Sequence, residues 1–169
     1  LAAREAIDVV YTSDLLRAWE TARPVAEATG APLHTDEGLR ERGFGSFQGK
    51  TFTEIEAAMP EEARRWRQRD PFWAPPGGES LTAMRRRVIE TLHALASRHV
   101  GEQIVLVAHG GVIDVLYRAA TGQELQTPRT WLLGNTAINR LLWSPEGLSL
   151  VGWSDTSHLD DETLDENTA

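Results

Sequence analysis

The sequence contains no cysteine, which excludes disulfide bonds, thiolate catalysis and cysteine-ligated zinc. No apolar run approaches about 18 residues, the length typical of a membrane-spanning helix. The first residues lack the basic start and apolar stretch of a signal peptide, so we expect a cytoplasmic protein. No cluster of side chains has the spacing of a metal site, and we expect neither a metal nor a cofactor.

Excess positive charge is also lacking, since the net charge of the 169 residues is -8. Six of the negative charges lie between Asp155 and Ala169, where there is no lysine or arginine, so the rest of the chain is close to neutral. We expect residues 160–169 to form a solvated, poorly ordered acidic tail. The body lacks the charge that nucleic acid or an anionic membrane would attract, and we expect neither as a partner.

The pattern of apolar residues alternates between strand-like and helix-like segments. Strands are predicted at 7–11, 31–35 and 103–108, and a final hairpin at 136–143 and 148–153. Helices are predicted at 15–29, 51–59, 60–68, 80–101 and 111–120, with cap residues at 12–14 and a kink or early end at Pro24 as an alternative for the first. Residues 1–159 are therefore expected to form one three-layer α/β/α domain, with helices on both faces of a mostly parallel sheet.

The most informative segment runs from Val105 to Ile113, where an apolar strand ends in His109 and is followed by Gly110 and Gly111. It reads as a buried strand, a tight loop and the start of a helix. Ligands of open α/β sheets bind at the carboxyl ends of the strands, and free N–H groups at a helix start suit an anion such as phosphate. His109 is a candidate for phosphate chemistry, and a histidine that merely closes a loop is the alternative.

Two further positions are candidates for chemistry. Arg17 falls on the first turn of the helix after a strand, where its charge opposes the helix dipole, so helix stability does not explain it. Glu41 lies in a loop with three glycines and two phenylalanines, and a carboxyl held against aromatic rings can act as a general acid. A solvated arginine and an exposed glutamate are the alternatives. Ser80 and Glu79 are explained by helix capping alone.

Six segments, taken in order, resemble the histidine phosphatase superfamily, whose fold is shared with cofactor-dependent phosphoglycerate mutase. They lie at 13–18, 39–49, 76–81, 108–111, 135–138 and 157–159. The resemblance implies a phosphoglycerate mutase-like fold and hydrolysis of small phosphate monoesters through a phosphohistidine. It places an arginine that holds the phosphoryl group at Arg17, the acid at Glu41 and a second phosphate-binding histidine at His109. Ser13 and Gly110 are the other residues that we expect to contact phosphate.

The sequence departs from the family at its start. The family opens with a strand ending in Arg-His-Gly, which supplies the attacking histidine, and this triplet does not occur here. His34, His93 and His99 lack its neighbours and are interpreted as structural or surface residues. We expect the chain to begin roughly 35–40 residues late, which is the size of a strand, a loop and a helix start. On this interpretation residues 1–169 alone are inactive.

The sequence indicates the branch of the superfamily less specifically than it indicates the superfamily itself. The segment 48–55 resembles the small phosphatases more than the glycolytic mutases, and Phe44 stands where mutases usually carry a tyrosine. The region of Trp66, Phe72 and Trp73 is expected to cover the site, with packing in a satellite apolar cluster as the alternative. Four nearby arginines could contact an anionic substrate or form a solvated face: Arg64, Arg65, Arg67 and Arg69.

Three functions are consistent with these observations. A phosphatase acting on a small phosphorylated metabolite is favoured, and a homodimer is left open. A phosphoglycerate mutase-type phosphotransferase is the first alternative. A non-catalytic protein that binds a phosphorylated ligand is the second, and it would account for the missing nucleophile.

Overall fold

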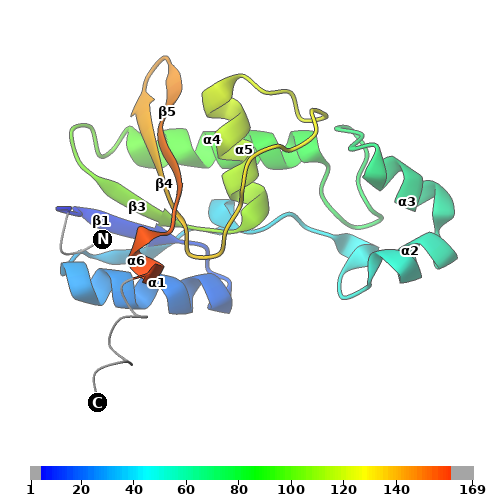
Figure 1. Cartoon of the computed structure of the whole chain (residues 1–169), viewed down its shortest axis with the longest axis horizontal. Coiled ribbons are helices and arrows are strands. Elements are labelled where there is room, and N and C mark those ends of the chain that lie inside the picture. The colour runs from blue at the N-terminus through cyan, green and yellow to red at the C-terminus, as the bar shows by residue number, and fades with distance from the viewer. Residues whose placement is uncertain (1–4, 161–169) are drawn as a thin grey trace.

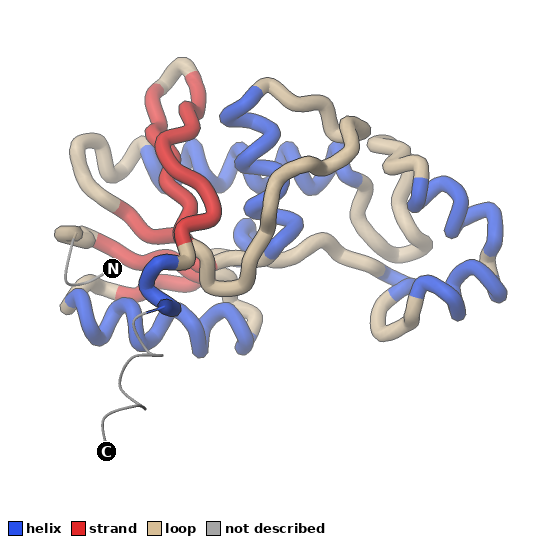
Figure 2. Tube along the Cα trace, viewed as in Figure 1, coloured by secondary structure: helices blue, strands red, loops and turns tan. Residues whose placement is uncertain are grey.

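The computed structural model describes residues 5–160, and its centre is a parallel sheet of three strands in the order β2-β1-β3 (Figures 1 and 2). The strands are β1 (Val9–Thr12), β2 (Leu33–Thr35) and β3 (Ile104–Val107). A separate antiparallel hairpin consists of β4 (Ile138–Ser144) and β5 (Gly147–Asp155). The α-helices are α1 (Leu16–Thr29), α2 (Phe52–Ala58), α3 (Pro60–Arg67), α4 (Leu81–Ala96), α5 (Gly110–Thr121) and α6 (Ser157–Asp160).

Helices cover both faces of the three-stranded sheet, with α1 on one side and α4 and α5 on the other (Figure 1). Side chains along a strand point alternately to its two faces, so β1 contributes to two cores. Val10 packs with Ala22 of α1, whereas Val9 packs with Leu95 of α4. The predicted α/β fold with helices on both faces of a parallel sheet is confirmed.

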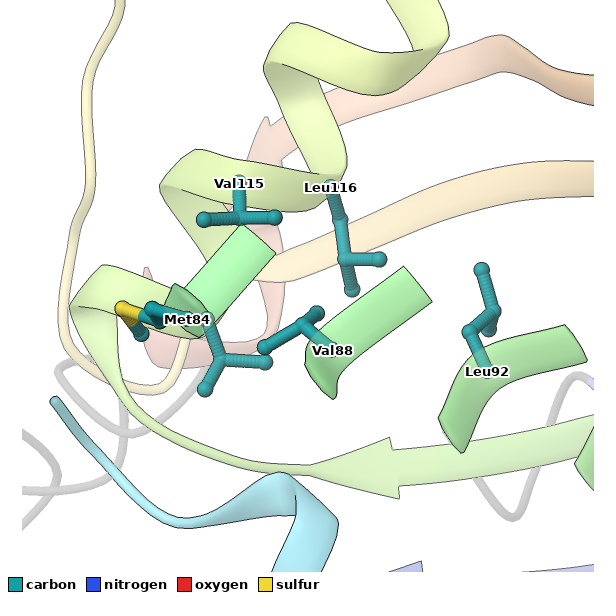
Figure 3. Close-up of a cluster of buried hydrophobic side chains, with 6 residues drawn as sticks. Met84, Val88, Leu92, Val115 and Leu116 are labelled. Atoms are coloured by element: carbon teal, nitrogen blue, oxygen red, sulfur yellow. The ribbon is translucent and has the colours of Figure 1, made fainter. Parts of the chain in front are cut away.

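The largest apolar core lies between α4 and α5. Met84, Val88 and Leu92 repeat at helical spacing on α4 and meet Val115 and Leu116 of α5 (Figure 3). Val88 is completely buried, and Ser80 caps the helix by accepting the N–H of Ala83 at 3.1 Å. This core fixes α5, and therefore the loop that precedes it, against the rest of the domain.

Helices α2 and α3 lie together at one end of the molecule, away from the sheet (Figures 1 and 2). A capping box formed by Thr51 and Glu54 starts α2, as the sequence predicts. Behind the two helices, Trp66 packs against Phe44 and Phe47, with ring centroids 5.4 and 5.6 Å apart, and Trp73 joins the same cluster. The satellite apolar cluster, given above as the alternative for this region, is what Trp66 and Trp73 form.

The prediction that residues 103–108 form a buried strand is wrong in one respect. The strand β3 exists, but all four of its residues are only half-buried, whereas all four residues of β1 are buried. The reason is position, because β3 pairs with β1 on one side only and is an edge strand among the described residues. The apolar side chains of β3 are therefore only partly covered by the rest of the described residues.

Several boundaries also differ from the prediction. No side chain of residues 12–14 caps α1, which begins at Leu16 after an uncapped Leu15, and the helix passes through Pro24 without ending. Helix α4 ends at Ala96 rather than at the predicted residue 101, and residues 97–101 form turns and a bend.

Asp155, the first of the six acidic residues near the end of the sequence, belongs to the folded domain. Asp155 ends β5 and forms an ion pair with Arg140 at 3.0 Å, and its bonds from Ser157 and Arg140 lower its pKa to about 2. Of the predicted tail at 160–169, Asp160 is the last residue of α6, and residues 161–169 lie outside the described residues. Within residues 5–160, no helix has the length and apolar character needed to cross a bilayer.

Candidate active site

His109 lies where β3 passes into α5, at the carboxyl edge of the parallel sheet. Its side chain is buried, with 7% of its surface exposed, and its Nε2 is hydrogen-bonded to the Oγ of Ser13 at 2.9 Å. Ser13 follows β1, and the register pairs Thr12 with Val107, so the two strand ends bring these side chains together. The tight loop and helix start predicted around His109 are present, with Gly110 exposed as the first residue of α5.

The surroundings of His109 favour its uncharged form. Burial is the largest cause that lowers its pKa, and the positive charge of Arg17 is the second. Glu41 and Asp14 act in the opposite direction, and Arg87 acts in the same direction as Arg17. An anion bound beside this imidazole would offset Arg17 and favour the protonated ring, which donates from both nitrogens.

Arg17 occupies the first turn of α1 and is exposed. Arg17 follows β1 and His109 follows β3, the parallel neighbour of β1, so both residues lie at the same edge of the sheet although they are 92 positions apart in the chain. The prediction that Arg17 lies at the same edge as His109 is confirmed, and their joint role in holding phosphate stays a prediction. An exposed guanidinium opposite a buried imidazole can hold two sides of a phosphoryl group.

Glu41 lies on the other side of His109, between two short 3-10 turns at Glu37–Leu39 and Gly45–Phe47. One carboxylate oxygen accepts the N–H of Gly111 at 3.0 Å, and the other accepts the N–H of Arg42 at 2.8 Å. The carboxylate is thus held at the start of α5, while the loop's phenylalanines pack on Trp66. A Cβ at position 111 would collide with the Glu41 carboxylate, so the carboxylate can lie this close to α5 only because residue 111 is glycine.

Two ion pairs that the sequence analysis missed support these residues. Arg40 donates to Asp14 through its Nε at 2.7 Å and through a second bond, and this contact lowers the pKa of Asp14. Arg87 of α4 makes a two-bond pair with Glu79 at 2.7 and 2.9 Å. It also donates to the carbonyl oxygens of Gly38 and Arg40 at 2.8 and 2.9 Å, which fixes the backbone before Glu41. Sequence spacing gave no signal for contacts between such distant segments, and Glu79 does more than the capping role expected for it.

The other histidines have structural surroundings. His99 is hydrogen-bonded to the hydroxyl of Tyr11 at 2.9 Å and to Glu102 at 2.6 Å. The indole of Trp143 contacts His93 at 3.3 Å. The charges that act on His109 come from arginine, glutamate and aspartate, and none comes from a histidine. Among residues 5–160, no group of three or more His, Cys, Asp or Glu side chains is arranged to hold a metal ion.

The fold and the site define an α/β protein in which an arginine, a buried histidine and a carboxylate come from three segments to the carboxyl edge of a parallel sheet. A family model for the histidine phosphatase superfamily, branch 1, matches residues 1–156. The chain belongs to this superfamily, as its sequence motifs indicate.

The chain is similar to a phosphoglycerate mutase-like protein and to phosphatases. Phosphoglycerate mutase-like protein 4 of Arabidopsis thaliana is 35% identical over 164 residues, which cover 95% of this chain and 70% of the relative. Glucosyl-3-phosphoglycerate phosphatase of Mycolicibacterium vanbaalenii is 38% identical over 129 residues, covering 72% of this chain and only 56% of that enzyme. The solved structure of Bacillus stearothermophilus YhfR superimposes with a TM-score of 0.82 at 29% identity, covering 92% of this chain and 78% of that one.

Proposed function

We propose that this protein hydrolyses small phosphate monoesters, with the phosphoryl group bound between Arg17 and His109 and with Glu41 as the acid. The observation that carries the proposal is that three separate segments bring Arg17, His109 and Glu41 to one edge of the sheet, where Glu41 accepts from Gly111 at the start of α5 and the charge of Arg17 acts on His109. Ser13, bonded to His109, and the exposed N–H of Gly110 would complete the contacts to phosphate. Relatives that are phosphatases of the same superfamily support hydrolysis as the reaction.

The proposed reaction has two steps. In the first, a nitrogen of an attacking histidine forms a bond to phosphorus, the bond from phosphorus to the ester oxygen breaks, and that oxygen takes a proton from Glu41. In the second, water attacks phosphorus and gives a proton back to the Glu41 carboxylate, the bond from the histidine nitrogen to phosphorus breaks, and phosphate and the free histidine are released.

The attacking histidine is proposed to come from a strand outside residues 1–169. The support is the open side of β3, where an apolar strand is half-buried and pairs on one side only among the described residues. A parallel strand added there would cover β3, and its carboxyl end would lie next to His109. Within residues 1–169, the hydrogen bond from His109 to Ser13 supports the proposal that His109 binds phosphate rather than attacks it.

The experiment compares residues 1–169 with a chain that carries an additional N-terminal strand with an Arg-His-Gly end. We expect only the longer chain to hydrolyse p-nitrophenyl phosphate and to carry phosphate on the added histidine after acid-free trapping. Residues 1–169 should bind vanadate without turnover, which is the behaviour of the binding-protein alternative. Robust hydrolysis by residues 1–169, or phosphate trapped on one of their five histidines, would show that the chemistry is placed wrongly.

A further inference from the structure

A cavity of about 360 Å³ adjoins the proposed phosphate site on the α5 side of Glu41. The residues that it shares with that site are Glu41, Gly110 and Gly111. Its other charged lining residues are three arginines and one carboxylate, namely Arg42, Arg69, Arg129 and Asp114. A ligand with its phosphoryl group at His109 would therefore extend directly into a space lined by positive charge.

Arg42 is half-buried in this wall without a carboxylate among its hydrogen-bond partners. Its Nε donates to the carbonyl oxygen of Glu79 at 2.8 Å, and its guanidinium lies over the ring of Trp66, 4.7 Å from the centroid. Burial lowers the pKa of Arg42, and among the charges around it Arg69 lowers it further, against the attraction of Glu79 and Glu41. The positive charges of Arg42 and Arg69 thus repel each other across the cavity lining, and a bound anion would offset this repulsion.

Arg69 is fixed just after α3 in a left-handed backbone conformation, with φ of 51°. Its Nε donates to the carbonyl oxygen of Leu125 at 2.9 Å, and it reaches Asp114 at 3.4 Å. Asp114 is shared, because Arg118 also donates to it at 2.9 Å. Burial and the charge of Arg118 lower the pKa of Arg69, and Arg129 adds to this effect. One carboxylate therefore serves two guanidiniums, and positive charge is left over.

We infer that the cavity binds a second anionic group of the substrate, a carboxylate or another phosphate, through Arg42, Arg69 and Arg129. The inference rests on the proposed function, since it takes the phosphoryl group to lie at His109. Paired guanidiniums suit such a group because each presents a planar fork that bonds to two oxygens at once. Phosphate monoesters with an acidic group a few bonds from the ester oxygen are thus the favoured substrate class.

The test uses phosphonates, which bind like phosphate esters but cannot be hydrolysed, so that the result does not depend on turnover. Calorimetry on the full chain compares 2-carboxyethylphosphonate with propylphosphonate, which lacks the carboxylate. A third ligand, propane-1,3-diylbisphosphonate, shows whether the second group is a carboxylate or a phosphonate. We expect at least one of the two doubly anionic ligands to bind about tenfold more tightly than propylphosphonate, or about 1.4 kcal/mol.

The variants Arg42→Gln and Arg69→Gln should each reduce that preference at least fivefold. Arg129→Gln serves if either fails to fold, because Arg129 is exposed, and it should lower the preference in the same direction. Arg67→Gln is the matched control, since Arg67 pairs with Glu56 on the surface at 2.9 Å and should keep the wild-type preference. Equal binding of all three ligands, or a preference that these cavity variants leave unchanged, would overturn the inference. Selective binding, with no hydrolysis of any ester by the longer chain that carries the Arg-His-Gly strand, would instead count against the proposed function alone.

Discussion

The arginines on the two sides of Glu41 are used in different ways. On one side a cavity of about 730 Å³ is lined by Arg40 and Arg87, and each of these bonds to a carboxylate, Asp14 and Glu79 respectively. On the other side, Arg42 bonds to a carbonyl oxygen, and Arg69 shares its carboxylate with a third arginine. The first pair ties segments of the chain together, whereas the second set leaves charge for a ligand. Similar residue types thus serve structure and binding within one site.

The largest effect is expected at the phosphate-binding groups. We expect His109→Ala and Arg17→Ala each to lower the turnover of the complete protein by at least about 100-fold, because each removes a charge-assisted bond to the transferring phosphoryl group. Steady-state hydrolysis of p-nitrophenyl phosphate measures the loss, and circular dichroism checks the fold. Near-normal turnover in both folded variants would contradict their assignment.

Arg87→Met should lower the stability of the fold, whereas the previous two variants lower turnover in a folded protein. It breaks the two-bond pair with Glu79 and leaves the carbonyl oxygens of Gly38 and Arg40 without this donor. We expect the free energy of unfolding to fall by about 2–3 kcal/mol, as for other part-buried ion pairs that lose one member. Urea titration measures this change, with Arg64→Met as the control.

Arg64 pairs with Glu61 on the exposed side of α3, and its replacement should cost no more than about 0.5 kcal/mol. If Arg87→Met lowered the free energy of unfolding no more than this control, Arg87 would not stabilise the fold in the way that the comparison requires.

A smaller and more selective effect is expected at Glu41. Glu41→Gln should slow an alkyl phosphate at least about tenfold more than p-nitrophenyl phosphate, because an alkoxide needs a proton as it leaves and a nitrophenolate hardly does. Gly111→Ala should do the same, since its Cβ would displace the carboxylate. Measured rates for both esters decide the point, and equal slowing by Glu41→Gln would exclude Glu41 as the acid.

The smallest effect concerns the dependence of stability on pH. Burial and Arg17 lower the pKa of His109 from its usual 6.5, so the unfolded chain binds this proton more readily than the folded protein. The contribution to stability is therefore fully present above pH 6.5 and is lost as the pH falls below it. Unfolding of the wild type and of His109→Gln across this range should show a smaller loss in the variant. Parallel curves would mean that His109 titrates normally.

Much of the fold follows from local patterns in the sequence. Ser80, the Thr51–Glu54 capping box and the glycines at 30 and 122 mark helix ends that the structure contains. Helical spacing from Met84 to Leu92 gave the buried face of α4. These features depend on neighbours in the chain, and they could be predicted for that reason.

The site was predictable only in part. His109, Arg17 and Glu41 stand in local motifs, so they could be named as candidates, and the structure places Arg17 and His109 at one edge of the sheet and Glu41 against the start of α5. The pairing of Asp14 with Arg40 and the four bonds of Arg87 depend on how distant segments meet, which no local pattern specifies. The half-burial of β3 could not be predicted either, because it reflects which strands flank β3 rather than its own composition.

The most direct measurement follows the histidine ring signals by NMR while vanadate, a phosphate-like anion, is added to the protein. Binding between Arg17 and His109 should shift the ring nitrogens of His109 toward the protonated form and leave His34, His93 and His99 unchanged. The Arg17→Ala variant should need at least tenfold more vanadate for the same shift, since a charge-assisted bond is worth about 1.5–3 kcal/mol. A shift confined to another of these histidines, or vanadate binding that Arg17→Ala leaves unchanged, would contradict the placement of the phosphoryl site at the start of α5.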